Sequence, residues 1–288
     1  MTVLVLGATG NVGPHVVNSL HGAGTTARVL VRDGARARDL WGEGVDIRSG
    51  DLREPGVLSS AMEGVDSVLL VSPHSFSMSD LQLGVIREAR RSGARIVKLS
   101  GTRSAIRPDG PHACRQHWEV ERVLQDSGQP FVILRPNSFM QVLVGKQLIP
   151  GLQATGVVPN PIAGSGISFI DARDVGEVAA RVLLTHDWDS SVLELTGPRS
   201  VTYAEIARLA AELLGSEITV SEITPADVRA TLTARGMPDW EAGHFEEMYQ
   251  LFRDGESEFV THTVEQITGS PARTVEAFLA EQLAPVAA

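Results

Sequence analysis

Cysteine occurs only once in the 288 residues, at Cys114, which excludes an internal disulfide and suits a reducing cytoplasm. No apolar run is long enough to span a bilayer, and the opening stretch MTVLVLGATG has no basic flank, so we expect neither a membrane anchor nor a signal peptide. The formal net charge is −10, and this excess of acidic residues argues against a nucleic-acid surface. We therefore expect a cytoplasmic monomer or homodimer without nucleic acid or membrane as a partner.

Tyrosine and lysine are also rare. The tyrosines are Tyr203 and Tyr249, and the lysines are Lys98 and Lys146. Arginine supplies the other basic residues, which we interpret as the bias of a GC-rich genome. The eight histidines show no metal-ligand spacing and no Gly-x-Ser-x-Gly motif is present, so neither a metal site nor a serine hydrolase is indicated.

Short apolar runs alternate with segments of helical spacing along the first half of the chain. The expected strands are 2–6, 27–31, 45–47, 66–72, 95–100 and 130–134, and the expected helices are 11–22, 35–41, 55–62, 79–92 and 112–127. Nearly continuous apolar strands indicate a sheet covered on both faces, and strand-helix-strand spacing indicates parallel crossovers. The pattern predicts an α/β fold with a doubly wound parallel sheet.

This rhythm breaks after Pro136. We expect one domain at 1–136 and a mixed region at 137–288, which completes the sheet at about 165–200 and then forms a smaller, mostly helical lobe. Within this region the pattern predicts a strand at 167–170, a helix from Asp174, a return to the sheet at 192–195 and a strand at 217–223. The alanine-rich tail, 284–288, is expected to be frayed.

The stretch VLVLGATGNVGPHVV places Gly7, Gly10 and Gly13 directly between the first strand and the first helix. Small residues allow a tight turn, let the backbone approach a pyrophosphate, and direct the helix N-terminus at it. The alternative is an ordinary glycine-rich turn. We predict a dinucleotide-binding Rossmann core over 1–136, with phosphate contacts from Gly7, Thr9, Gly10, Asn11, Val12 and Gly13.

The end of the second strand discriminates between the two nicotinamide cofactors. An acidic residue there suits the ribose of NADH, whereas an arginine suits the 2′-phosphate of NADPH. Arg32 occupies this tip and Asp33 follows, so we favour NADPH over NADH, the alternative being a solvated surface arginine. Loops after the next strands are expected to line the cofactor crevice with Asp51, Leu52, Val71, Ser72 and Pro73. For Asp51 a helix N-cap is an equal alternative.

With these motifs in place, the sequence resembles the NmrA-like branch of the atypical short-chain dehydrogenases. The matching stretches are GATGNVG, VRD, GDL, VSP, EVERVLQDSGQPFVILRPNSFMQ and FIDARDVGEVAA, spread over residues 3–185. The resemblance implies an NAD(P)-binding Rossmann fold. Members of this branch include NADPH-dependent quinone reductases, isoflavone-type and dye reductases, and regulators that sense the nicotinamide redox state without turnover.

Many members of the wider superfamily use a Tyr-x-x-x-Lys pair, in which the tyrosine protonates the nascent alkoxide. Here Tyr203 and Tyr249 are followed four residues later by Ala207 and Arg253, so the pair is absent. Alignment with the family pattern puts His117 at the lysine position, as in some quinone-reductase-like members.

His117 lies at the edge of the apolar stripe of its expected helix, three residues before Val120 and seven before Leu124. A histidine there can bond the cofactor ribose or transfer a proton near neutral pH. The alternative is a half-buried helix histidine held by a carbonyl.

Other candidate residues follow the later strands. Ser100 and Thr102 offer hydroxyls that polarise a substrate or, equally, satisfy the backbone of a turn. The resemblance implies a nicotinamide and substrate pocket walled by later residues and covered by a helix within 237–258, although core packing explains several of them as well. These residues are Pro136 and Asn137 for the cofactor, and His74, Phe139, Met140, Trp240, His244 and Tyr249 for the substrate.

The combined prediction is an NADPH-dependent oxidoreductase that delivers hydride to a quinone, an enone or a similar conjugated small molecule, with His117, Ser100 and Thr102 as catalytic candidates. Conjugated acceptors need less acid assistance, which suits a site without the tyrosine and lysine pair. Two alternatives stay open. One is a non-catalytic redox sensor that binds the dinucleotide, and the other is a tailoring enzyme that performs non-redox chemistry.

Overall fold

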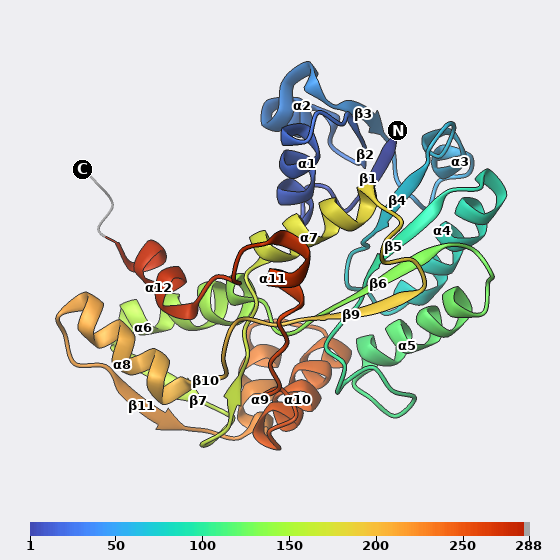
Figure 1. The fold of residues 1–288 in the computed structure, drawn as a ribbon. Coiled ribbons are helices and arrows are strands. Elements are labelled where there is room, and N and C mark those ends of the chain that lie inside the picture. Colours follow the sequence, from blue (N-terminus) through green and yellow to red (C-terminus); the bar gives the residue numbers. More distant parts are fainter. Residues whose placement is uncertain (285–288) are drawn as a thin grey trace. The chain divides into compact units, whose positions relative to one another are not determined.

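The computed structural model describes residues 1–284, so most of the alanine-rich tail lies outside the described part. The chain divides into two compact units (Figure 1). The first comprises Met1–Gly101, Ala113–Arg135 and Ala172–Leu193. The second comprises Thr102–His112, Pro136–Asp171 and the chain from Glu194 onward.

The first unit is built on a seven-stranded sheet in the order β3-β2-β1-β4-β5-β6-β9. Its strands are β1 (Val3–Leu6), β2 (Ala27–Val31), β3 (Asp46–Ser49), β4 (Ser67–Leu70), β5 (Arg95–Leu99), β6 (Phe131–Pro136) and β9 (Ser191–Leu195). The neighbouring pairs from β3 to β6 are parallel. The strand order reverses between β1 and β4, which is the point where such sheets bind ligands. The predicted doubly wound α/β fold is confirmed.

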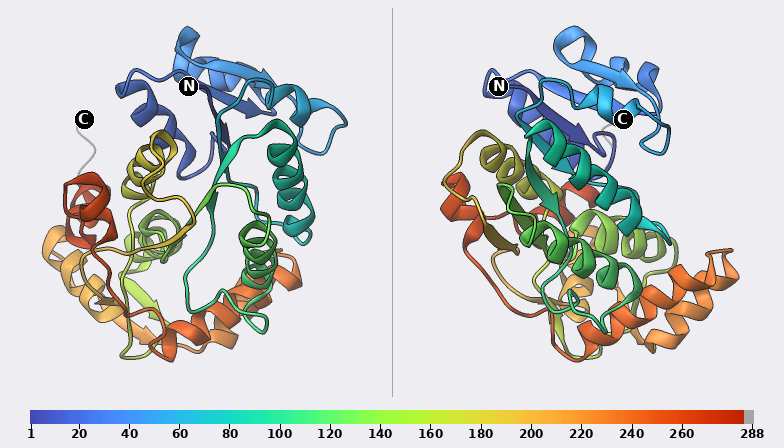
Figure 2. Two further views of the ribbon diagram at one scale, coloured as in Figure 1. Left: turned by 45° about the vertical axis from the view of Figure 1, so that its right-hand side comes forward. Right: turned by 90° about the vertical axis from the view of Figure 1, so that its right-hand side faces the viewer.

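Helices cover both faces of this sheet, as the apolar strands require (Figure 2). The helices are α1 (Gly13–Gly22), α2 (Gly34–Trp41), η1 (Gly42–Gly44), α3 (Val57–Ala61), α4 (Met78–Ser92), α5 (His112–Gln125) and α7 (Ala172–Leu184). A continuous apolar core joins one face of the sheet to α3, α4 and α5. On the other face α7 packs on α1, where a Cβ on Gly176 would lie 2.4 Å from the Cβ of His15. Only glycine permits that approach.

The second unit is mostly helical, as predicted. It contains the π-helix η2 (Met140–Leu148), α6 (Ile149–Thr155), α8 (Tyr203–Leu214), α9 (Pro225–Ala234), α10 (Asp239–Arg253), α11 (Thr263–Thr268) and α12 (Val275–Leu283). Two small sheets accompany them, formed by β8 (Gly166–Ile167) with β10 (Val201–Thr202) and by β7 (Val157–Asn160) with β11 (Thr219–Glu222). Their apolar core includes Met140, Tyr203, Tyr249 and Phe278.

Several predicted elements differ in extent or pairing. The strand expected at 167–170 is only Gly166–Ile167, and the helix expected from Asp174 begins at Ala172. The strand expected at 217–223 exists as β11 but pairs with β7, a strand that the Gly/Pro-rich pattern does not predict. The expected return of the chain to the main sheet at 192–195 is correct, because β9 forms its edge.

Candidate functional site

The glycine-rich turn joins β1 to α1, and Gly7 and Gly13 each have a distinct steric reason to be glycine. Gly7 adopts a left-handed backbone with φ of +65°, and its carbonyl accepts a hydrogen bond from the Gly10 N–H at 3.0 Å. A Cβ on Gly13 would lie 2.3 Å from the Gly7 oxygen, and a Cβ on Gly7 would lie 2.9 Å from Val71. The turn therefore packs tightly against itself and against the residue that follows β4.

Helix α1 begins at Gly13 without a side-chain cap and without an acidic residue in its first turn. Pro14 stands in that first turn, where a missing N–H removes no intrahelical bond. The N-terminal end of a helix carries partial positive charge and unpaired N–H groups. This end of α1 can thus take an anionic group, and it follows a turn that allows a close approach.

Arg32 and Asp33 follow β2 and have different surroundings. Arg32 is exposed at the tip of the strand. Asp33 is the N-cap of α2, where its Oδ1 accepts a hydrogen bond from the Arg36 N–H at 3.0 Å. The Asp33 carboxylate therefore stabilises the start of a helix, while the Arg32 guanidinium stays at the surface.

Asp51 follows β3 and binds Arg53. Its Oδ1 accepts the backbone N–H of Arg53 at 2.9 Å, and its Oδ2 lies 2.6 Å from Nη2 of that guanidinium. These hydrogen bonds hold the pKa of the Asp51 carboxyl well below its usual range. The N-cap alternative for Asp51 is wrong, because α3 begins only at Val57 and its N-cap is Gly56. The intervening residues form a turn that Asp51 itself stabilises.

The remaining cofactor candidates of the first unit lie on the same sheet edge. Leu52 is half-buried, and Ser72 accepts a hydrogen bond from the buried Gln82 at 2.9 Å. Pro73 and His74 are exposed. The carboxyl ends of parallel strands share one edge, so this part of the predicted set is brought together with the glycine turn.

A buried polar network links β5, α5 and β6. Nζ of Lys98 lies 2.8 Å from Nδ1 of His117. The Ser100 hydroxyl donates to Oε1 of Glu121, and Arg135 Nη2 lies 2.5 Å from Oε2 of the same carboxylate. His117 and Glu121 are four residues apart on α5, so they share one face of the helix. The Ser100 hydroxyl therefore donates its hydrogen bond to a side chain of the protein, Glu121.

Lys98 has no exposed surface. Burial lowers the pKa of its ammonium to about 7; the charge of Glu121 works against this shift and that of Arg135 adds to it. A lysine with this pKa changes its charge near neutral pH. Its nearest basic neighbour is the ring of His117, which is half-buried.

Sequence reasoning missed Lys98 as a functional residue. The available signal is its place in RIVKL, where a cation interrupts a strand that is expected to be buried on both faces. Glu121 could have been found in a similar way. It lies four residues after His117, beside the apolar stripe of α5, where an acidic residue indicates a buried carboxylate.

Apart from Ser100, the candidates that follow β5 and β6 belong to the second unit. Thr102 is 4% exposed, and its hydroxyl has no hydrogen-bond partner among residues 1–284. Pro136 is buried at the end of β6, and Asn137 donates from Nδ2 to Ser168 Oγ at 2.8 Å. Phe139 is half-buried. Met140 is fully buried in the core of this unit, and Asn137 also donates to the carbonyl of Ser257.

Helix α10 carries the candidates Trp240, His244 and Tyr249. The ring of Trp240 lies 5.4 Å from the ring of His112, and that of His244 lies 5.9 Å from Phe245. These rings form small aromatic clusters within the second unit.

Both tyrosines are core residues. The Tyr249 hydroxyl donates to Gln147 at 2.6 Å, and burial raises its pKa to about 12. Burial also raises the pKa of Tyr203 well above its usual value. Since neither is followed by lysine and both are buried, the structure places no accessible phenol in the part that it describes.

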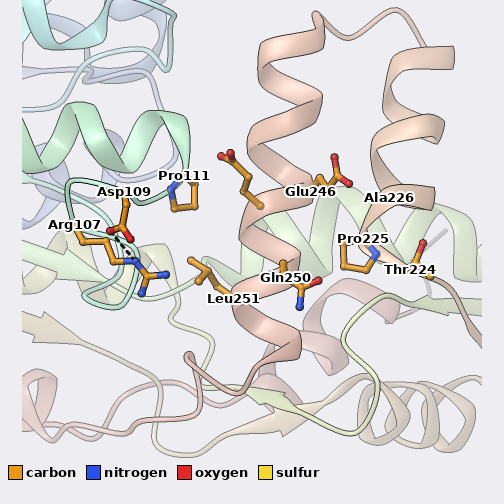
Figure 3. A pocket seen from close by; sticks show the side chains of 10 residues that line it. Arg107, Asp109, Pro111, Thr224, Pro225, Ala226, Glu246, Gln250 and Leu251 are labelled. Carbon is orange, nitrogen blue, oxygen red and sulfur yellow. Dashed lines mark ion pairs between the residues drawn. The ribbon is translucent and has the colours of Figure 1, made fainter.

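A pocket of about 480 Å³ lies between the loop that follows β5 and helices α9 and α10 (Figure 3). Its lining residues are Arg107, Asp109, Pro111, Thr224, Pro225, Ala226, Glu246, Glu247, Gln250 and Leu251. Arg107 pairs with Glu256 at 3.0 Å and with Asp109 at 3.5 Å. None of the predicted α10 residues, Trp240, His244 and Tyr249, is among the residues that line this pocket.

Residues 1–284 contain neither a metal-binding cluster nor a membrane-spanning helix. No group of three or more His, Cys, Asp or Glu side chains in that range is arranged to hold a metal ion. Within the same range, no helix combines the length and the apolar character needed to cross a membrane.

The fold and the phosphate turn define a Rossmann-type nucleotide-binding protein. The chain belongs to the NmrA-like family, whose model matches residues 1–279. The predicted membership is confirmed.

Relatives match along nearly the whole chain. NAD(P)H azoreductase of Xenophilus azovorans is 32% identical over 277 residues, which cover 96% of either protein. The (4-alkanoyl-5-oxo-2,5-dihydrofuran-3-yl)methyl phosphate reductase of Streptomyces griseus is 31% identical over 281 residues, which cover 97% of either protein. The structure of an NADPH-dependent quinone oxidoreductase of Escherichia coli in complex with NADPH matches with a TM-score of 0.87 and 25% identity, over 97% of this chain and 99% of the other.

Proposed function

We propose that this protein is an NADPH-dependent reductase that delivers hydride to a conjugated small-molecule acceptor. The observation that carries the proposal is the glycine turn from Gly7 to Gly13 at the uncapped start of α1, on the sheet edge where such folds bind dinucleotides. Reductase relatives that match over almost their full length support the redox assignment.

NADPH is preferred over NADH because of the residues that follow β2. The exposed Arg32 guanidinium suits a 2′-phosphate, which it can bind through two hydrogen bonds. An NADH site needs a carboxylate for the ribose, and that of Asp33 already caps α2. The quinone oxidoreductase solved with NADPH agrees with this preference, whereas the name of the azoreductase, NAD(P)H, covers both cofactors.

The acceptor class follows from chemistry that the named relatives share. An azo compound, a quinone and an acyl-substituted oxo-dihydrofuran each delocalise the negative charge that hydride addition creates. Delocalisation lowers the demand for a strong acid at the site. This chain lacks an accessible phenol, so it suits such acceptors better than a simple ketone.

In this reaction NADPH supplies the hydride. The residues of the chain bind and orient the cofactor, exclude water and provide a proton. We assign the proton transfer to His117, whose ring is half-buried on α5 and whose Nδ1 is held by Lys98. The Ser100 hydroxyl, which donates to Glu121, then orients the network instead of polarising the acceptor.

The test is NADPH consumption against a panel of quinones, conjugated enones and azo dyes, with cofactor fluorescence followed in the same samples. We expect acceptor-dependent consumption that His117→Ala lowers by about 10²-fold or more while NADPH still binds. Binding without consumption for every acceptor would favour the redox sensor. Activity that persists without nicotinamide would favour the non-redox enzyme.

Arg32→Ala tests the choice of cofactor. Loss of a charged contact to the 2′-phosphate is expected to weaken NADPH binding by about 10- to 100-fold, while NADH affinity changes little. Fluorescence titration with both cofactors measures the two affinities. Arg90→Ala, at an exposed arginine in the last turn of α4, is the matched control and should leave both unchanged. Equal weakening for NADH and NADPH would show that Arg32 does not read the phosphate.

A further inference from the structure

We propose that Lys98 is the positioning residue of the site: it holds the ring of His117 and replaces the proton that the imidazole passes to the substrate. The inference rests on the proposed function, since it describes how His117 would act in that reaction. It assigns to a lysine on β5 and a histidine on α5 the task that the absent Tyr-x-x-x-Lys pair performs elsewhere.

The shortest hydrogen bond of the Lys98 ammonium is to the ring of His117. The Lys98 side chain has no exposed surface, and its Nζ lies 2.8 Å from Nδ1 of the imidazole. The only other contact of Nζ recorded within the described residues is a longer one of 3.3 Å to the Leu99 carbonyl. An ammonium donates and has no lone pair, so a protonated Lys98 fixes Nδ1 as the acceptor and leaves the ring proton on Nε2.

The surroundings of Lys98 do not neutralise its charge. In strand register, the apolar Leu70 of β4 and Ile133 of β6 stand opposite it. Glu121 on α5 favours the charged form, but its carboxylate is bound by Arg135 of β6, which opposes it. Among residues 1–284, a charged Lys98 has no ion-pair partner of its own, so its proton is readily released.

The proton transfer balances through the ring. The acceptor gains a hydride from NADPH and becomes an anion. The Nε2–H bond of His117 breaks and its proton goes to that anion, while Nδ1 takes a proton from Nζ of Lys98. The products would be the reduced substrate, NADP⁺, a neutral imidazole with its proton on Nδ1, and a neutral amine. A proton from solvent would then bind at Nε2 of His117 and Nδ1 would return its proton to Nζ, which restores the ammonium of the buried Lys98.

The first test uses the fact that Lys98 and Lys146 are the only lysines. In protein labelled with ¹³C-lysine, each ε-carbon signal is followed against pH, and Lys98→Met assigns its own signal by loss. We expect the Lys98 signal to titrate near pH 7 and to shift by at least half a pH unit in His117→Ala. A Lys98 signal that titrates at the ordinary lysine value of about 10.4, or that does not respond to His117→Ala, overturns the proposal whether or not the protein turns over.

The second test is kinetic. Lys98→Met should lower kcat by about 10- to 10³-fold with NADPH affinity unchanged, and Lys98→Arg should keep the hydrogen bond yet lose the inflection near pH 7, since arginine does not release its proton. The double variant with His117→Ala should be no slower than the slower single variant. Multiplicative losses in the double variant would show that Lys98 acts apart from His117 and would overturn the proposal. Lys146→Met is the control for loss of a lysine and should keep wild-type kcat.

Discussion

Gly13→Ala is expected to weaken NADPH binding by more than about 100-fold and to destabilise the fold by roughly 1–3 kcal/mol. The added Cβ would lie 2.3 Å from the Gly7 oxygen and 2.5 Å from the Ala8 Cα, both backbone atoms. The start of α1 would therefore have to move away from the turn to which we assign the pyrophosphate. Fluorescence titration with NADPH and urea unfolding measure the two effects.

Two companion variants separate binding from stability. Gly84→Ala places a Cβ in open space on α4, where the nearest atom is the end of the Arg87 side chain, so it should stabilise slightly and leave binding unchanged. Gly10→Asp adds a carboxylate beside the expected phosphate and should abolish binding. Unaltered NADPH binding in both Gly10→Asp and Gly13→Ala would refute the assignment of this turn to the phosphate.

Lys98→Met is expected to raise the free energy of unfolding at pH 6 by roughly 3–5 kcal/mol. In the folded protein burial lowers the Lys98 pKa to about 7, whereas the unfolded chain has an ordinary lysine. Between pH 7 and about 10.4 the unfolded state therefore binds more protons than the native state. By linkage, wild-type stability rises across that window, and below pH 7 the cost of the buried charge is present in full.

The measurement is urea unfolding of wild type and Lys98→Met from pH 6 to pH 10. The advantage of the variant should be greatest at low pH and should shrink as the pH rises through the window. Lys146→Met, at an exposed lysine, should show no such trend. A constant difference between wild type and Lys98→Met at all pH values would contradict the lowered pKa.

The alternation of the chain predicts the Rossmann sheet because strands buried on both faces must be apolar throughout. β2, expected at 27–31, has those bounds, and β9 returns to the sheet as expected. The β7–β11 pair behaves differently. β7 contains Pro159 and is not predicted as a strand. β11 is predicted at 217–223, but it is exposed along its whole length, so it has no burial pattern that would indicate its pairing with β7.

The candidate site also has one part that the sequence predicts and one part that only the structure reveals. The stretch GATGNVG determined by itself the phosphate turn, because its glycines contact one another within a few residues and their steric limits are local. The stretch VLVRD likewise placed Arg32 and Asp33 at the end of β2, although the capping role of Asp33 appears only in the structure.

Tertiary structure alone decided the pairing of Lys98 with His117, which lie 19 residues apart on a strand and a helix. It also decided the hydrogen bond from Asn137 to Ser257, across 120 residues, and the place of Thr102–His112 in the second unit. Such contacts depend on the register of strands and on how helices pack on the sheet. Strand register and helix packing result from many side-chain contacts at once, so they cannot be read from a short stretch of sequence. A single lysine in an apolar strand therefore indicates a buried cation but does not show which residue binds it.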